Sequence, residues 1–199
     1  MIFAEDRDEY WSEKFNKVDF SGLTLSSKEF EGCTFAECDF SEAIFEHCNF
    51  VDCEFSKCNL SVANIKYSKF SEVTFVESKL IGVNWTNLTL SKYALGTPMK
   101  FYKCILNDSS FFGLVFHELI VEECKAHNVD FREGDFSRAN FTYSDFTSSL
   151  FNRTNLTGTD FSEAINYDID ILENTLKNAK FSRHEAVRLL DCLEIELVD

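Results

Sequence analysis

The eight cysteines are the first residues whose type could do chemistry, because thiolates bind zinc and paired thiols form disulfides. Their spacings are mostly multiples of five residues and lack the Cys-x2-Cys pairs that are typical of zinc sites. We therefore predict no metal site and no disulfide framework. Seven are interpreted as small, buried core residues and the eighth as part of a helix; in chain order they are Cys33, Cys38, Cys48, Cys53, Cys58, Cys104, Cys124 and, in the helix, Cys192.

Other catalytic signals are weak. The four histidines are scattered, and the sequence has no Gly-rich phosphate loop and no nucleophile motif. We predict that the protein is not an enzyme and needs no cofactor.

Charge narrows the choice of partner. The chain carries 34 Asp and Glu against 19 Lys and Arg, a net charge of −15. Such an excess disfavours direct binding to nucleic acid or to anionic membranes and favours a basic protein partner. No stretch is long and apolar enough for a membrane span, and the N-terminus has no signal-peptide pattern. These features predict a cytoplasmic protein with reduced thiols.

A five-residue repeat dominates the sequence. Every fifth residue from Phe15 to Leu90 is apolar, 16 positions in all, and Leu95 continues the series. After a slip of one residue, 16 of 17 positions from Phe101 to Phe181 are apolar, with Asn166 as the exception. Neither an α-helix nor a flat strand keeps a period of five on one face. A chain that turns a corner every five residues does, and its stacked coils bury a column of aromatic rings.

A second, small position lies two residues before each large central residue. It is usually Cys, Ala, Ser or Thr, while the three remaining positions of the unit are mostly polar. We expect the central and the small residue to point inward and the other three to face solvent.

The units SEAIF, SRANF and TGTDF resemble the pentapeptide-repeat family, and the resemblance spans residues 15–181. It implies an all-β, right-handed, quadrilateral parallel β-helix with about four repeats per coil. Roughly eight coils at ~4.8 Å each would give a rod of roughly 40 Å.

Four further stretches resemble the topoisomerase-protecting branch of that family, which includes Qnr, MfpA, McbG and AlbG, with AlbG the nearest. They are VNWT, CILNDSSFFGL, INYDIDILENTLKNAKFS and RLLDCLEIELVD. The resemblance implies a DNA-mimicking bacterial homodimer that binds DNA gyrase and topoisomerase IV and protects them from a poison of the albicidin, quinolone or microcin type. The alternative is a scaffold or adaptor solenoid with another protein partner.

Residues 20 apart should stack in columns, so acidic residues at this spacing are the candidate partner-binding sites. The candidates are Asp52 with Glu72 on the next coil, Glu123 with Glu163 two coils further on and Tyr143 between them, and Asp108 with Asp168 in a column that also holds Asn128 and Ser148.

The register slip falls on a short predicted loop, Gly96, Thr97, Pro98, Met99 and Lys100. Many Qnr proteins carry extended loops that matter for protection. The sequence predicts that this chain lacks such loops, because the repeat has no other slip. That absence argues against a Qnr-like protective mechanism toward fluoroquinolones.

The ends of a solenoid need covers, since exposed strand edges aggregate. Residues 1–14 are predicted to be an N-terminal extension or cap, with Tyr10 and Trp11 packing on the first coil. Residues 182–199 are predicted to form a capping α-helix, opened by a Ser182–Glu185 capping box, and a strand over 194–198. The apolar residues of this segment are the candidate dimer contacts, namely Ala186, Leu189, Leu190, Leu193, Ile195 and Leu197.

Overall fold

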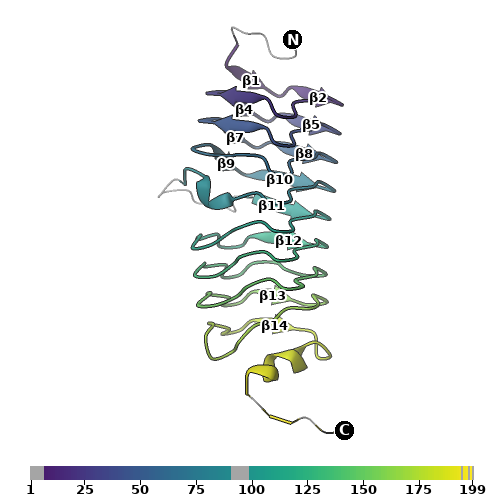
Figure 1. Ribbon diagram of the computed structural model, residues 1–199, viewed down its shortest axis with the longest axis vertical. Coiled ribbons are helices and arrows are strands. Elements are labelled where there is room, and N and C mark those ends of the chain that lie inside the picture. The colour runs from purple at the N-terminus through teal and green to yellow at the C-terminus, as the bar shows by residue number, and fades with distance from the viewer. Residues whose placement is uncertain (1–6, 91–98, 194, 197, 199) are drawn as a thin grey trace.

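The computed structural model describes residues 7–90, 99–193, 195, 196 and 198. The chain winds into a rod of stacked coils, with the two termini at opposite ends (Figure 1). Every strand pair is parallel, and most partners lie 20 residues apart, as in Phe15 with Phe35 and Phe30 with Phe50. The predicted parallel β-helix is confirmed.

The strands form four sheets, in the orders β1-β4-β7-β9, β12-β11-β10-β8-β5-β2, β13-β14 and β3-β6. Most strands are three residues long, with the central residue buried. Their bounds are β1 Glu9–Trp11, β2 Lys14–Asn16, β3 Thr24–Ser26, β4 Glu29–Glu31, β5 Thr34–Ala36, β6 Ile44–Glu46, β7 Asn49–Val51, β8 Glu54–Ser56, β9 Lys69–Ser71, β10 Val73–Val76, β11 Met99–Tyr102, β12 Ile120–Glu122, β13 Asp160–Phe161 and β14 Lys180–Phe181. Two 3-10 helices, η1 Trp85–Asn87 and η2 Ala186–Leu193, complete the elements.

The core is a set of aromatic stacks that run along the rod. The Phe35 ring is stacked between those of Phe15 and Phe55, with centroids 4.9 and 4.6 Å away. The ring of Phe40 meets Phe35 edge-on at 5.5 Å. Offset stacks and edge contacts are the favoured aromatic geometries, so a period of five gives each ring both kinds of neighbour. Phe112 is 41% exposed, as its place outside the repeat predicts.

The small inward position supplies a hydrogen-bond donor as well as space. The Cys33 thiol donates to the Tyr10 carbonyl, and the hydroxyls of Ser144 and Thr159 donate to the carbonyls of Val121 and Phe136. In each case the acceptor belongs to a central residue of the preceding coil. Cys, Ser and Thr are short enough for this site, and each adds a hydrogen bond to a buried backbone carbonyl. Burial raises the pKa of the Cys53 thiol to about 12, so this cysteine stays a neutral donor.

The slip in the repeat corrects two predictions. Val73 pairs with Met99, so this coil has 26 residues instead of 20 and is six residues longer than its neighbours. Met99 and Lys100 lie in strand β11, not in a loop, while Gly96, Thr97 and Pro98 lie outside the described residues. Leu90 is 45% exposed, so the inward series ends before it. A period of five could not reveal the insertion, because six extra residues shift the register by only one.

A second slip occurs near Asn166, which the sequence analysis places at an inward central position. Phe151 pairs with Ile169, so the coil is two residues shorter here. Tyr167 and Ile169 are buried in its place. The polar Asn166 is thereby moved to a corner with φ 58°, where its side chain reaches polar partners.

Strand β1 begins the solenoid inside the segment that the sequence analysis treats as an extension. Tyr10 is buried and stacks on Phe30 at 5.1 Å, whereas Trp11 is 65% exposed and does not pack on the coil. At the other end, helix η2 covers the last coil, with Leu189 packed against the core. It is wound as a 3-10 helix, and no strand includes Ile195, Glu196 or Val198.

Gly134 occupies the small inward position that faces Phe136. A methyl group at Gly134 would lie 2.4 Å from the Phe136 ring and 3.0 Å from the Leu114 carbonyl oxygen. Gly134→Ala should therefore lower the free energy of unfolding by about 1–3 kcal/mol, measured by chemical denaturation. Adding Phe136→Leu, which removes the ring edge, should recover part of this loss. Losses that simply add in the double variant would contradict the overlap.

Candidate protein-binding surface

Outward side chains form columns along the rod, and one column follows each corner. The corner residue lies two positions after the central residue and in most units has a positive φ. Its side chain points away from the core, while its backbone N–H donates to the next coil, as Asp52 does to Ser71. Five of the six predicted acidic site residues occupy corners, namely Asp52, Glu72, Asp108, Glu123 and Glu163.

The sixth predicted residue, Asp168, lies outside its predicted column, because the coil between Phe151 and Ile169 is two residues shorter than most others. Since Phe151 pairs with Ile169, the corner occupied by Ser148 in one coil is occupied by Asn166 in the next. The predicted column of Asp108, Asn128 and Ser148 therefore continues to Asn166, and Asp168 stacks beside Leu150 instead. The prediction that Asp108 and Asp168 share a column is wrong, because it assumed an unbroken spacing of 20.

Lysine side chains neutralise much of the acidic charge in one corner column. Its ion pairs join Lys17 to Glu37, Lys57 to Glu77, and Lys103 to Glu123, with nitrogen–oxygen distances of 3.7, 3.7 and 3.6 Å. Glu123 is thus part of a ladder of alternating charge rather than of an acidic column. Each exposed pair contributes little to stability, but it cancels the field that a basic partner would sense.

Two other predicted acids are also engaged. Glu72 lies 3.9 Å from the Lys100 ammonium, and Glu163 accepts a 2.8 Å hydrogen bond from the Ser182 hydroxyl. The predicted Ser182–Glu185 capping box is therefore replaced, because Ser182 bonds Glu163 and the carboxylate of Glu185 bonds Arg188.

A further group of aspartates holds the fold together. Each precedes a central residue, and its carboxylate accepts a hydrogen bond from the backbone N–H two positions later, as Asp135 does from Ser137. This is an Asx turn, which stabilises the corner locally. The pattern recurs at Asp19, Asp39, Asp130, Asp135, Asp145 and Asp160.

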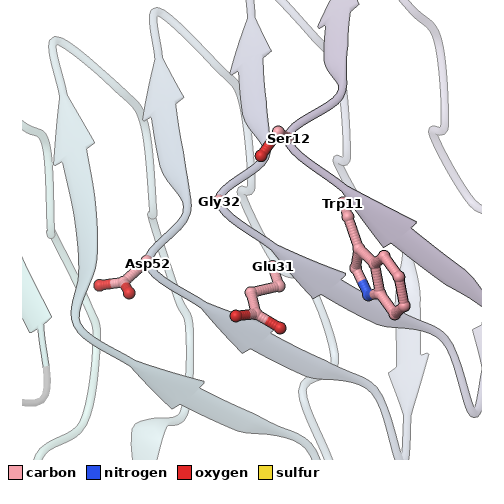
Figure 2. Close-up of a pocket in the computed structure, with 5 residues that line it drawn as sticks. All are labelled: Trp11, Ser12, Glu31, Gly32 and Asp52. Atoms are coloured by element: carbon pink, nitrogen blue, oxygen red, sulfur yellow. The ribbon is translucent and has the colours of Figure 1, made fainter.

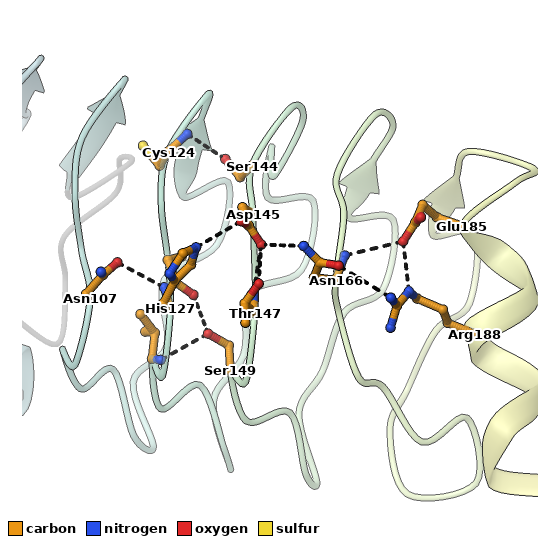
Figure 3. A network of polar contacts seen from close by, with 12 residues as sticks. Asn107, Cys124, His127, Ser144, Asp145, Thr147, Ser149, Asn166, Glu185 and Arg188 are labelled. Carbon is orange, nitrogen blue, oxygen red and sulfur yellow. Dashed lines mark hydrogen bonds and ion pairs between the residues drawn. The ribbon is translucent and has the colours of Figure 1, made fainter.

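Asp145 lies at the centre of a polar network that spans several coils (Figure 3). Its carboxylate accepts hydrogen bonds from Thr147 and Asn166 and lies 2.9 Å from Nε2 of His127. Asn166 in turn accepts from Arg188 of η2, so the network links three coils to the terminal helix.

Acid should weaken this network. Burial alone would raise the pKa of Asp145, but the hydrogen bonds from Thr147, Asn166 and His127 outweigh it and lower the pKa to about 2. The unfolded value is about 3.9. Because the folded pKa is depressed, Asp145 stabilises the fold above about pH 4, and this contribution is lost as the pH falls toward 2.

Asp145→Asn should therefore lower the melting temperature at pH 7 and flatten its dependence on pH between 4 and 2. Circular dichroism melts from pH 2 to 7 measure both effects. Glu54→Gln, at an exposed position in strand β8, is the control. Parallel curves for the wild type and Asp145→Asn would contradict the assigned role.

The outward face of β1-β4-β7-β9 differs from the charge ladder. Glu9 and Glu29 are directly paired neighbours, so like charges stack on adjacent coils. Among the described residues no cation forms an ion pair with Glu9, Glu29, Glu31 or Asp52. Stacked like charges destabilise a sheet. The column of Lys17, Glu37, Lys57 and Glu77 avoids this cost by alternating the sign of the charge, whereas Glu9 and Glu29 do not. We define the four carboxylates of Glu9, Glu29, Glu31 and Asp52 as the acidic sheet face.

A shallow depression lies on this face. It is lined by Trp11, Ser12, Glu31, Gly32 and Asp52. Figure 2 shows the Trp11 indole and the Glu31 carboxylate side by side, with Asp52 on the following coil. Trp11 and Glu31 are paired across β1 and β4. Asp52 is a predicted site residue, whereas Glu31 and Trp11 are not, because in the sequence each is only one more outward strand position.

The remaining predicted residues lie at the C-terminal end. Leu193 and Ile195 are 37% and 53% exposed, whereas Ala186, Leu189 and Leu190 are partly buried. Leu197 lies outside the described residues. Among the residues that the structure describes, no cluster of His, Cys, Asp and Glu could hold a metal ion, and no helix is suited to cross a bilayer.

The fold and surface define a class of protein, an acidic parallel β-solenoid built on five-residue units. A family model described as a pentapeptide repeat region matches residues 28–98 and 96–161. These ranges cover more than half of the chain, which therefore belongs to the pentapeptide-repeat family.

Solved structures of QnrB1, described as a plasmid-mediated fluoroquinolone resistance protein, are similar in fold. Two trypsin-treated variants share 22% identity with this chain, with TM-scores of 0.61 and 0.62. The alignments cover 96% of this chain and 92% and 90% of theirs. Full-length QnrB1 is 21% identical over 94% of this chain and 90% of its own, with a TM-score of 0.50. No curated protein matches the sequence.

Proposed function

We propose that this protein binds type II topoisomerase, with DNA gyrase as the main target and topoisomerase IV as a second, and protects the enzyme from a poison. It acts as a DNA mimic that occupies the enzyme's DNA-binding surface and needs no catalytic activity. The observation that carries the proposal is the acidic sheet face, where Glu9, Glu29, Glu31 and Asp52 have no ion-pair partner among the described residues. A protein surface that binds DNA carries Lys and Arg side chains, whose positive charge is complementary to these carboxylates.

The likeness to QnrB1 supports the proposal at the level of fold and guides the choice of drug. The 26-residue coil matters here, because the prediction against fluoroquinolones rests on the absence of an extended loop from the repeat. That ground no longer holds, since the coil is six residues longer than its neighbours. Fluoroquinolones are therefore tested beside albicidin.

The mimicry concerns shape and sign rather than charge density. Duplex DNA carries one charge per ~1.7 Å of axis. On the surface of this protein, by contrast, Lys side chains neutralise part of the acidic charge. We propose the acidic sheet face as the principal contact, with Glu72, Asp108, Glu123, Glu163 and Asp168 as further contacts. Glu72 and Glu123 contribute less, because Lys100 and Lys103 pair with them.

We also propose that the active form is a homodimer joined through residues 182–199. The exposed apolar side chains of Val187, Leu193, Ile195 and Val198 support this, because they gather at one end of the rod. Light scattering should give about twice the 23.0 kDa chain mass. A monomer mass at micromolar concentration would reject the dimer.

The test is a supercoiling assay with purified gyrase, relaxed DNA and ATP. The protein is titrated with and without a fluoroquinolone or albicidin. Rescue of supercoiling in the poisoned reaction would establish protection and identify the drug class. Inhibition of the drug-free reaction alone would support binding to gyrase without protection. No effect on gyrase or topoisomerase IV would reject the proposal and favour the scaffold or adaptor function.

The salt dependence gives an independent check on the binding mode. Exposed charges are screened over about 8 Å at physiological ionic strength. Binding to gyrase should therefore weaken steeply as salt rises, whereas binding that rests on apolar contacts would not.

A further inference from the structure

The depression on the acidic sheet face combines an exposed aromatic side chain with carboxylates. Trp11 is 65% exposed, although a large aromatic side chain gains by burial. Its neighbour on the next coil is Glu31, and Asp52 lies one coil further along. An indole and two carboxylates therefore surround one hollow (Figure 2).

Gly32 keeps the hollow open. It occupies the corner between Ser12 and Asp52 and has φ 61°. Other corners of this chain hold Glu, Lys or Asp at the same φ, so glycine is not required there by backbone conformation alone. Its missing side chain leaves space beside Glu31 and Trp11.

The nearby cations of the chain are engaged elsewhere. Arg7 pairs with Glu13, and its guanidinium lies over the Tyr10 ring at 4.6 Å. Lys28 pairs with Asp8 at 2.7 Å. The hollow thus presents a negative potential and an aromatic surface to solvent.

We propose that this hollow is the docking site for one arginine side chain on an exposed segment of a partner protein. The guanidinium stacks on the Trp11 indole, and its N–H groups donate to the carboxylates of Glu31 and Asp52. Arginine fits better than lysine because its planar, delocalised group can stack and form several directed hydrogen bonds at once. The acidic sheet face attracts the basic segment, and the hollow fixes its register.

This proposal deepens the proposed function, since it names the chemistry of the partner at the same surface, but its test does not need topoisomerase. The probe is a fluorescein-labelled peptide of alternating glycine and arginine, with a glycine–lysine peptide of equal length and charge. Fluorescence anisotropy at low salt measures the affinity for the full-length protein. An unlabelled arginine peptide, titrated separately, should protect Trp11 from acrylamide quenching, while Trp85, which is buried, contributes a constant background.

We expect Trp11→Ala to weaken binding of the arginine peptide about three- to fivefold and to abolish the preference over lysine. The pair Glu31→Gln and Asp52→Asn should weaken binding about tenfold. The matched controls are Tyr143→Ala, another exposed aromatic residue, and Glu42→Gln with Glu46→Gln, which remove the same charge from other faces. These controls should change the affinity less than twofold.

Equal losses in the control variants, or unchanged arginine preference in Trp11→Ala, would overturn the proposal and leave only general attraction by charge. Arginine-selective binding without rescue of gyrase would retain the hollow and reject the topoisomerase target. If the wild-type protein rescues gyrase but Trp11→Ala binds the arginine peptide as tightly as the wild type, the topoisomerase target is retained and the arginine site is rejected.

Discussion

Replacing Phe35 by alanine should lower the free energy of unfolding by about 3–5 kcal/mol, the range for truncating a buried phenylalanine. The ring is fully buried and stacks on Phe15 and Phe55, so its loss breaks the aromatic column on both sides. A four-sided coil with backbone hydrogen bonds to its neighbours has little freedom to collapse into the space. Guanidinium denaturation followed by circular dichroism measures the change.

The matched control is Phe112→Ala, which removes the same atoms from a ring that is 41% exposed. Its effect should stay below about 1 kcal/mol. In a solenoid each coil contacts only its neighbours, so unfolding can lose cooperativity. The slope of the denaturation curve is therefore compared first, and comparable losses for Phe35→Ala and Phe112→Ala would contradict the stacked core.

Reversing the charge of the acidic sheet face should have the largest effect on function. Glu29→Lys, Glu31→Lys and Asp52→Lys together change the net charge from −15 to −9, since each reversal adds two charges. At least about tenfold more protein should be needed for half-maximal rescue of poisoned gyrase, because attraction to a basic surface becomes repulsion. The fold should persist, since the three side chains are exposed at strand and corner positions.

A second triple variant controls for net charge alone. Glu42→Lys, Glu46→Lys and Glu54→Lys produce the same net charge on other faces of the same coils. A loss of rescue much smaller than that of the first variant would locate the contact on the acidic sheet face. Equal losses would show that only overall charge matters. Reversal of Asp108, Glu123 and Glu163 tests the contacts farther along the rod in the same way.

The sequence alone determined the solenoid and its interior. A period of five with one large and one small residue per unit admits only a chain that turns regularly and buries both. The buried positions of Phe35 and Cys33 followed directly from this pattern. The hydrogen-bonding role of the small residues did not, because the pattern reports size, whereas the acceptor carbonyl comes from the preceding coil.

In the sequence, the two slips are visible only as departures from the period of five. The number of residues inserted or missing at each slip is not visible there. An insertion of six residues and a slip of one give the same register, so the sequence placed Met99 in a loop where the structure has strand β11. Near Asn166, two missing residues moved Asp168 out of its predicted column.

The charge pattern of the surface was decided by the tertiary structure. Counting acids identified Glu123 and Asp52 equally, yet Lys103 neutralises the first and no described cation pairs with the second. Trp11 and Glu31 are 20 residues apart and unremarkable in sequence, and they become neighbours because β1 and β4 pair in parallel. Electrostatic interactions depend on distances of a few ångströms between coils, and those distances exist only once the chain has been wound into register.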